Sequence, residues 1–318
     1  MSAIAQLGDQ QETVGFRQVL IATDFSPVSE RALAYALPIV RQFGSTLSIV
    51  HAIEPEPRES ITWDPLPREL DRRRIEAEQE MRRLSQEARI TGLNPHVWLE
   101  KGRIWDVVSS IIQRENTDLL VLGTHGRGGL KKVVLGSTAE EILRLATCPV
   151  LTIGPGVPPA DATRAEFETI LYATDFGVGS DRAFRYALSL ASACQAKLIL
   201  LHMVPPMPLV VTGRFDDSPG QFSSSTLTEW QLTMKDESLG KLRKMIPSDA
   251  RLASKPEYVI GLDIHSEGIL RTAEARGVGL IVMGANRFAS PRMVAHIPWT
   301  VTHEVICKAK CPVLTVLR

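Results

Sequence analysis

The feature that most constrains this fold is an internal repeat that covers almost the whole chain. Leu20-Ile-Ala-Thr-Asp24-Phe25 returns 151 residues later as Leu171-Tyr-Ala-Thr-Asp175-Phe176. Further along, the match of Gly123 with Gly284 and of the two Cys-Pro pairs is offset by 161 to 163 residues, so the second copy carries insertions. Two copies of one unit in 318 residues predict two domains of ordinary size that share one fold.

The two copies are separated by a short segment, Gly154-Pro-Gly-Val-Pro-Pro-Ala, whose composition is typical of a linker. A tail before the first copy lacks a periodic pattern, and we expect it to be loose. The expected organisation is a tail over 1–16, a first domain over 17–154, a linker over 155–167 and a second domain over 168–318.

Within each copy, short apolar runs alternate with amphipathic stretches. Strands that alternate with helices imply βαβ units and a parallel sheet with helices on both faces, an α/β fold. In the first copy the pattern predicts strands over 18–23, 46–52, 95–101, 118–123 and 149–153, and helices over 27–43, 69–91, 103–115 and 138–147.

The composition excludes several classes of partner and location. The formal net charge is zero, which gives no indication of nucleic acid or of an acidic membrane surface. No apolar run reaches the roughly 18 residues that a transmembrane helix needs, and the N-terminus lacks the pattern of a secretory signal. The four cysteines show no zinc-like spacing, so we expect reduced thiols in a cytoplasmic protein.

A glycine spacing in the first copy carries the clearest functional signal. Gly123-x2-Gly126-x9-Gly136-Ser137 follows a predicted strand and precedes a predicted helix. Glycines let backbone N–H groups approach an anion closely, and a helix N-terminus adds free N–H groups and a favourable dipole. The spacing therefore predicts a phosphate site, which is not a P-loop because no Gly-x4-Gly-Lys-Ser/Thr occurs.

At these residues the chain resembles a tandem universal stress protein, with two such domains end to end. The resemblance covers about 17–154 and 168–318 and rests on the glycine motif, on Ala22-Thr23-Asp24-Phe25-Ser26, on His51 at a strand end and on Cys148-Pro149-Val150. It implies that each copy is a Rossmann-like, doubly wound sheet of five parallel strands in the order 3-2-1-4-5. Ligands bind such sheets at the carboxyl ends of the strands where the order reverses, here between the first and fourth strands.

Members of the family that carry the glycine motif bind ATP, and the resemblance implies ATP with Mg²⁺ in the first domain. Asp24 would contact the nucleoside, and Ala52 would meet the adenine through its backbone. Lys131 and Lys132 would add positive charge near the phosphates. Carried over by position, the nucleotide-binding residues would be Ala22, Thr23, Asp24, Ala52, Leu122, Gly123, His125, Gly126, Arg127, Gly136, Ser137 and Thr138.

Several of these residues also have a purely structural interpretation. The sequence Ser-Thr-Ala-Glu that begins at Ser137 is a capping box, so Ser137 either caps its helix, binds phosphate or does both. Asp24 can instead cap the turn that follows it, and His125 can be a solvated loop residue. His51 and His202 are expected to form local hydrogen bonds at the ends of their strands.

The second copy lacks the glycine motif. We expect the loop length to be unchanged, so the aligned pairs are Gly126 with Arg287, Gly136 with Ile297 and Ser137 with Pro298. Side chains then stand where backbone should meet phosphate, and proline removes an N–H group from the helix start. We expect no ATP in this domain, while Arg287 and Arg292 leave another anion open.

The last strand of each copy is expected at a sheet edge, where an apolar strand needs a partner. The resemblance implies pairing through this strand, so we expect the two copies to form a pseudo-dimer within one chain. Further association into a homo-oligomer is also expected, as is a protein partner that the sequence does not identify.

The sequence thus predicts a regulatory, ATP-binding stress-response protein with one nucleotide per chain and a structural second domain. One alternative is a slow ATPase or an enzyme that phosphorylates itself at Ser137 or Thr138, for which no clear general base is present. Another alternative is a dimerisation scaffold that works without nucleotide.

Overall fold

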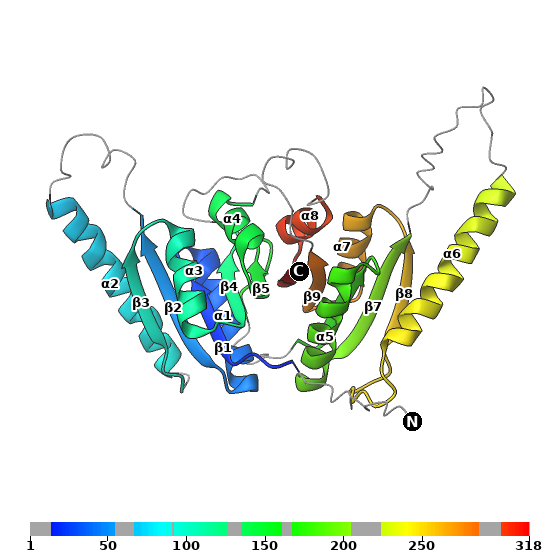
Figure 1. Ribbon diagram of the computed structural model, residues 1–318, viewed down its shortest axis with the longest axis horizontal. Coiled ribbons are helices and arrows are strands. Elements are labelled where there is room, and N and C mark those ends of the chain that lie inside the picture. The colour runs from blue at the N-terminus through cyan, green and yellow to red at the C-terminus, as the bar shows by residue number, and fades with distance from the viewer. Residues whose placement is uncertain are drawn as a thin grey trace, which may run out of the picture.

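The structure is a computed structural model that describes residues 14–54, 67–90, 92–125, 135–160, 167–204, 224–285 and 300–317. Its strands form one ten-stranded sheet in the order β3-β2-β1-β4-β5-β10-β9-β6-β7-β8 (Figure 1). Each half of this order reads 3-2-1-4-5 from its outer edge inward, which confirms the predicted topology in both domains.

The elements of the first domain lie within two residues of their predicted bounds. Its strands are β1 (Gln18–Ala22), β2 (Thr46–Ile53), β3 (His96–Lys101), β4 (Leu119–Gly123) and β5 (Val150–Ile153). Its helices are α1 (Pro27–Phe43), α2 (Pro67–Ile90), α3 (Ile104–Glu115) and α4 (Ser137–Leu145).

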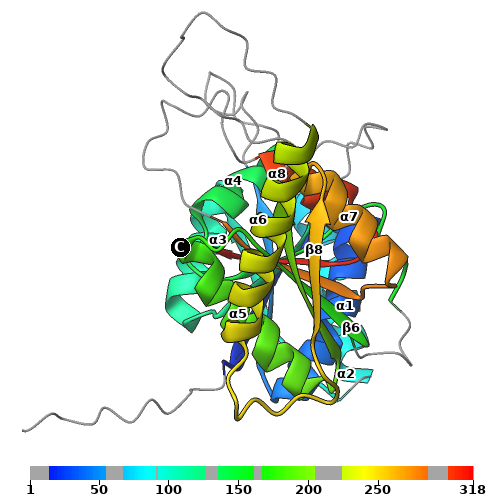
Figure 2. The ribbon, with the colours of Figure 1, turned by 90° about the vertical axis from the view of Figure 1, so that its right-hand side faces the viewer.

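The second domain repeats this order of elements. Its strands are β6 (Thr169–Thr174), β7 (Lys197–Val204), β8 (Glu257–Leu262), β9 (Leu280–Ala285) and β10 (Val313–Leu317). Its helices are α5 (Val178–Ala193), α6 (Ser224–Met245), α7 (His265–Ala275) and α8 (Thr300–Lys308). Figure 1 shows α2 and α6 at the two outer ends of the molecule, and Figure 2 looks along the sheet from the side of α6.

Helix α1 shows how the local sequence determines where a helix begins and ends. Ser26 caps its start, since the Ser26 side chain accepts a hydrogen bond from the Ser29 backbone N–H, and proline follows in the first turn. Gly44 ends the helix in the left-handed conformation, with φ of 63°. One face of the helix, with Ala32, Ala36 and Val40 among others, is buried against the sheet. This packing fixes where the turn between β1 and α1 lies.

The two domains join through their last strands. β5 and β10 pair antiparallel, with Leu151 opposite Leu314 and Thr152 opposite Val313. The Thr152 hydroxyl also donates to the Val313 carbonyl at 3.1 Å. The predicted pairing of the two copies within one chain is therefore confirmed.

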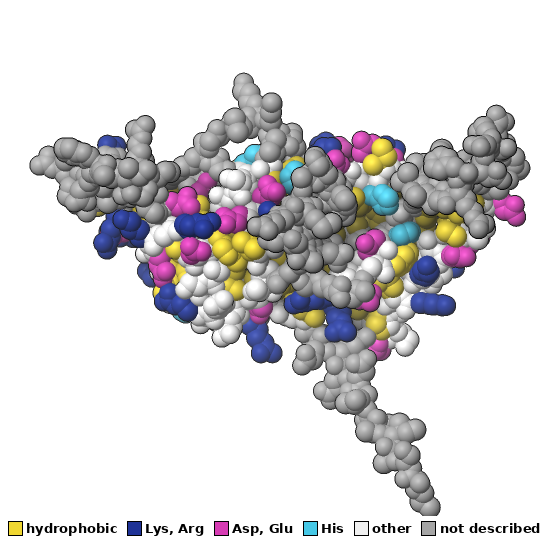
Figure 3. All heavy atoms as spheres, turned by 45° about the horizontal axis from the view of Figure 1, so that its top comes forward, with side chains coloured by type: hydrophobic (Ala, Val, Ile, Leu, Met, Phe, Trp, Pro, Cys, Tyr) yellow, Lys and Arg dark blue, Asp and Glu magenta, His cyan; other side chains and the backbone are white. Residues whose placement is uncertain are grey.

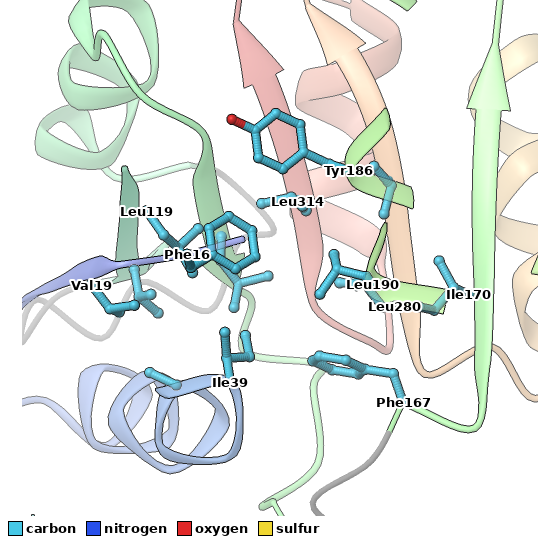
Figure 4. Packing of buried hydrophobic residues seen from close by; sticks show 14 of the residues in the cluster. Phe16, Val19, Ile39, Leu119, Phe167, Ile170, Tyr186, Leu190, Leu280 and Leu314 are labelled. Carbon is cyan, nitrogen blue, oxygen red and sulfur yellow. The ribbon is translucent and has the colours of Figure 1, made fainter. Parts of the chain in front are cut away.

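The N-terminal segment before β1 adds a second junction between the domains. Phe16 is only 2% exposed, and its ring packs edge-on against Phe43 of α1 and stacks on Tyr186 of α5, with centroids 5.3 and 5.7 Å apart. Figure 4 shows Phe16 among residues of both domains. The Ser189 hydroxyl in α5 donates to the Val14 carbonyl. Residues 14–16 are thus packed, and the predicted loose tail can concern only residues 1–13, which lie outside the described residues.

The surface carries both signs of charge. Figure 3 shows Lys and Arg side chains interspersed with Asp and Glu over the visible face. On α2, Arg72 and Arg74 form ion pairs with Glu76 and Glu78 one turn further along, at 2.9 and 3.0 Å. Among the described residues, every helix is too short or too polar to cross a bilayer.

Candidate functional site

A pocket of about 850 Å³ lies in the first domain at the carboxyl ends of β1 and β4. β1 pairs with β2 on one side and with β4 on the other, with Ala22 opposite both Val50 and Leu122. The strand order reverses here, which is where a doubly wound sheet opens a crevice. The volume is within the range of small-molecule and cofactor sites.

Most of the residues predicted from the sequence line this pocket. They are Ala22, Thr23, Asp24, Ala52, Leu122, Gly123, His125, Gly136, Ser137 and Thr138. The remaining two, Gly126 and Arg127, lie outside the described residues, as do Lys131 and Lys132. The structure therefore brings these predicted residues together at one pocket, and their binding of a nucleotide stays a prediction.

The lining also includes residues that sequence reasoning missed. Ile104 and Val108 of α3 are lining residues, as are Thr124, Leu135 and Pro155. Ile104 and Val108 are four residues apart on one helical face, but only the packing of α3 over the sheet shows that this face reaches the crevice. Pro155 comes just after β5, the last strand of the first domain, and nothing in the sequence there indicated a site.

The helix start at the pocket carries no side-chain cap. Gly136 is the N-cap of α4, with an extended backbone and no side-chain capping bond. The capping-box interpretation of Ser137 is therefore wrong, because Ser137 is the first residue inside the helix. The first amides of a helix have no partner within it, and Ser137, Thr138 and Ala139 all line the pocket. An anion is the natural partner for such a group of amides.

Gly136 is held in place from the end of β4. Its N–H group donates to the Thr124 carbonyl at 2.9 Å, and the Thr124 N–H group donates to the Ile153 carbonyl of β5 at 2.9 Å. A Cβ atom at Gly136 would lie 3.2 Å from the Thr124 oxygen, so the close approach favours glycine. The start of α4 is thereby tied to the ends of β4 and β5.

His125 lies beside this anchor. The Thr124 hydroxyl is 2.9 Å from His125 Nδ1. The other ring nitrogen, Nε2, is buried and has no hydrogen-bond partner among the described residues. Because buried polar atoms are normally satisfied, an acceptor or donor from a ligand is a suitable partner for this nitrogen.

The turn after β1 places Asp24 at the pocket. Phe25 adopts φ of 60°, an unusual value for a bulky residue, and its N–H group donates to the Thr23 hydroxyl at 3.0 Å. The Asp24 carboxylate accepts from the Ser26 N–H group at 3.0 Å. His51 supports the turn, with Nδ1 2.8 Å from the Thr23 carbonyl and its ring 4.3 Å from that of Phe25.

The second domain builds the same turn, which confirms the local role expected for both histidines. Phe176 has φ of 59°, and its ring lies 4.3 Å from His202. His202 Nδ1 is 2.8 Å from the Thr174 carbonyl. The turn is thus a property of the fold, whatever either domain binds.

The aspartate of this turn is engaged differently in the second domain. Gly177 stands at the N-cap of α5 and has no side chain with which to cap it. Asp175 accepts from the Gly177 N–H group at 2.8 Å, as Asp24 does from Ser26, and it also accepts from the Ser180 hydroxyl at 2.6 Å. Burial raises the pKa of Asp175, but these hydrogen bonds outweigh it, and the net shift is downward. Asp175 therefore serves the start of its own helix.

Gly123 has a structural role as well as a place in the pocket. A Cβ atom there would lie 3.0 Å from the Ser29 backbone nitrogen, and one at Gly284 would lie 2.7 Å from the Gly179 carbonyl oxygen. In each domain this glycine lets the first helix approach the end of the fourth strand. Its presence in both copies therefore follows from packing.

The structure corrects the alignment of the two glycine loops. β9 follows β4 by 161 residues, whereas α8 and β10 follow α4 and β5 by 163. The segment before α8 is thus two residues longer, and Thr300, not Pro298, has the position of Ser137. The pairing of Gly136 with Ile297 fails for the same reason. These loop residues of the second copy lie outside the described residues.

Comparison with known proteins gives a family match over both domains. The model described as the universal stress protein family matches residues 15–154 and again 166–316. A universal stress protein of Thermus aquaticus is 32% identical over 139 residues, which are 43% of this chain and 98% of that protein. One from Mycobacterium tuberculosis is 32% identical over 139 residues, which are 42% of this chain and 44% of that protein.

A solved structure that covers almost the whole chain shows the same fold. A universal stress protein of Archaeoglobus fulgidus superimposes with a TM-score of 0.64 and 19% identity, covering 96% of this chain and 98% of its own. A universal stress protein solved in complex with cAMP covers 48% of this chain and 98% of its own, with 17% identity and a TM-score of 0.33.

Proposed function

Because the chain belongs to the universal stress protein family, we propose that it is a regulatory stress-response protein whose first domain binds ATP. The observation that carries the proposal is the uncapped start of α4 at the pocket. The backbone amides of Ser137, Thr138 and Ala139 are suited to hold phosphate oxygens.

The rest of the lining suits the nucleoside. Val50, Ala52, Ile104 and Val108 contribute apolar side chains from β2 and α3. Such a surface favours a flat heterocycle, while the Asp24 carboxylate is an acceptor for ribose hydroxyl groups. One pocket thus combines an apolar part with an anion-binding part, as a nucleoside phosphate requires.

Mg²⁺ would reach the site with the nucleotide. Where the structure describes the chain, it contains no group of three or more His, Cys, Asp or Glu side chains that could hold a metal ion. Mg²⁺ keeps most of its water ligands and commonly binds through substrate phosphates. The residues around the pocket therefore fit Mg²⁺ as a partner of ATP rather than as a resident metal.

We propose a single nucleotide site per chain. In the second domain the Ser180 hydroxyl donates to Asp175, the counterpart of Asp24, at 2.6 Å. The sequence between Gly284 and Thr300 contains no further glycine. Whichever way the two loops are aligned, the second one therefore has no glycine at which backbone N–H groups could come close to a phosphate. The second domain then has a structural role.

Titration calorimetry of ATP with Mg²⁺ into the full chain, freed of copurified nucleotide, tests this function. We expect a stoichiometry near one, and Ser137→Asp should weaken binding by roughly tenfold or more, because its carboxylate repels phosphate. The same charge is favourable at a helix N-terminus, so the variant should stay folded. Thr300→Asp, at the corresponding position of α8, is the matched control and should bind ATP normally.

Other results would change the conclusion in defined ways. Two sites would refute the structural role of the second domain. Tighter binding of ADP, AMP or cAMP than of ATP would replace the ligand but keep the site. No binding of any of these nucleotides would favour the scaffold function.

A further inference from the structure

His125 is held from two sides just after the end of β4. The Thr124 hydroxyl is 2.9 Å from His125 Nδ1, and the Ser26 hydroxyl at the start of α1 donates to the His125 carbonyl at 3.3 Å. Thr124 is itself fixed, because its N–H group donates to the Ile153 carbonyl and its carbonyl accepts from the Gly136 N–H group. Both Thr124 and His125 line the pocket. The imidazole is therefore placed before any ligand arrives.

Either group can be the donor in the hydrogen bond between Thr124 and His125, and burial decides between them. Thr124 is 0% exposed, and among the described residues its hydroxyl has His125 Nδ1 as its one partner. If Nδ1 carried the proton, the hydroxyl would accept, and its own proton would be buried without an acceptor. The hydroxyl therefore donates to Nδ1, and the proton of the neutral ring lies on Nε2.

A proton on Nε2 gives the pocket a side-chain donor that has no acceptor. Nε2 is buried and lacks a hydrogen-bond partner within the part of the chain that the structure describes. The same pocket is lined by Ser137 and Thr138, whose N–H groups at the start of α4 have no partner within the helix. Donors that gather without acceptors suit an anion, since a hydrogen bond to a charged oxygen is stronger than one to a neutral group.

We propose that Thr124 is a positioning residue of the phosphate site, whose hydroxyl holds His125 in the tautomer with the proton on Nε2 so that His125 donates to a phosphate oxygen. This inference rests on the proposed function and adds a side-chain donor to the backbone amides of α4. Because the ring is already held in place, little conformational freedom is lost when the ligand binds.

The two residues that follow the corresponding glycine of the second domain are different. Thr124 and His125 come after Gly123, whereas Ala285 and Asn286 come after Gly284. Alanine has no hydroxyl with which to orient its neighbour, and an amide side chain has no tautomer to select. The oriented imidazole is therefore confined to the domain for which nucleotide binding is proposed.

Nitrogen chemical shifts of the histidine rings, measured on the full chain without nucleotide, test the tautomer. The chain has seven histidines, and the spectrum of His125→Leu identifies the signals of His125. At a pH where the ring is neutral, we expect the proton on Nε2 in the wild type. Thr124→Val, which has nearly the same shape but no hydroxyl, should shift part of the population to the Nδ1-protonated form. A proton on Nδ1 in the wild type, or an unchanged tautomer in Thr124→Val, would overturn the proposal.

Titration calorimetry with ATP and Mg²⁺ tests the consequence for binding. We expect Thr124→Val to weaken binding by roughly three- to tenfold, the worth of one hydrogen bond, and Thr124→Ser, which keeps a hydroxyl, to retain most of the affinity. Thr152→Val is the matched control and should bind ATP normally. Thr152 is also buried, but its hydroxyl donates to the Val313 carbonyl, and it lies outside the described lining of the pocket.

His125→Leu separates the orientation of the ring from general repacking. In that background Thr124→Val should change the ATP affinity by less than about twofold, because no imidazole is left to hold. A full loss that persists without the imidazole, or an equal loss in Thr152→Val, would overturn the positioning role. If the wild type binds no nucleotide, the proposed function fails, while the nitrogen spectra still decide whether Thr124 selects the tautomer of His125.

Discussion

At the scale of single residues, the two domains differ in how the first helix meets the aspartate after the first strand. Ser26 supplies a hydroxyl to the start of α1, whereas Gly177 supplies none to α5. The Ser180 hydroxyl of α5 donates to Asp175, whereas the Ser29 hydroxyl at the corresponding position of α1 donates to the Ser26 carbonyl. Each aspartate accepts from the N–H group two residues further on, so a change from serine to glycine at the N-cap redirects the serine hydroxyl in the first turn of the helix.

The glycine at the end of the fourth strand allows a test of packing. Gly284→Ala should destabilise the chain by about 1–3 kcal/mol, because the added Cβ would lie 2.7 Å from the Gly179 carbonyl oxygen. Gly240→Ala in α6 is the control. Its Cβ meets nothing within 4 Å, so alanine should stabilise the helix by about 0.5–1 kcal/mol. Urea denaturation measures both values, and equal effects would contradict the steric argument.

His202 predicts a pH dependence of stability. Burial lowers the pKa of His202, and His265 and Lys241 lower it further, while the Thr174 carbonyl and Asp175 act in the opposite direction. The unfolded chain then binds more protons than the folded one below the ordinary histidine pKa of about 6.5. The contribution of His202 to the free energy of unfolding is fully present above that pH and is lost as the pH falls toward the lowered pKa.

Denaturation midpoints between pH 7.5 and pH 5 test this expectation. The wild type should lose stability more steeply with falling pH than His202→Gln, which has no group that titrates in this range. Parallel curves for the two proteins would show that the burial of His202 has no such effect.

At the scale of elements, the sequence was sufficient to predict the bounds of those helices and strands that short-range patterns determine. The bounds of α1 were predicted correctly because Ser26-Pro27 and Gly44 mark its ends locally. The strands around the pocket were found because each is a short apolar run, and their carboxyl ends brought Asp24 and Gly123 together as expected.

Features that depend on packing were missed. The cap of α4 is Gly136 and not Ser137, because the bond from Gly136 to Thr124 decides where the helix begins. The prediction of an unchanged loop length before α8 was wrong, because counting along one sequence does not locate an insertion within a loop. Phe16 looked like part of a tail because its partners Phe43 and Tyr186 are distant in sequence.

At the scale of the whole molecule, the two domains share one sheet, and each of the two buried clusters contains side chains of both copies. One cluster contains Phe16, Val19 and Leu151 of the first copy together with Tyr186 and Leu314 of the second. The domain boundary therefore lies within the buried core. We expect both domains to unfold together.

Phe16→Ala tests this cooperativity. It should lower the free energy of unfolding by about 3–5 kcal/mol, the usual cost of removing a buried ring, and leave one transition. Leu262→Ala, at a side chain that is 46% exposed, is the control and should change stability little. The fluorescence of the five tryptophans and far-UV circular dichroism should give one midpoint. Two separate transitions in the wild type would contradict a shared core.

The antiparallel pairing of β5 with β10 also determines how the protein responds to dilution. If the two domains were separate polypeptides that paired through these strands, they would dissociate when the protein concentration fell below their dissociation constant. Here both strands belong to one polypeptide, so each meets the other at a local concentration that the chain itself sets. The two domains therefore stay paired whether a cell holds a few copies of the protein or many thousands.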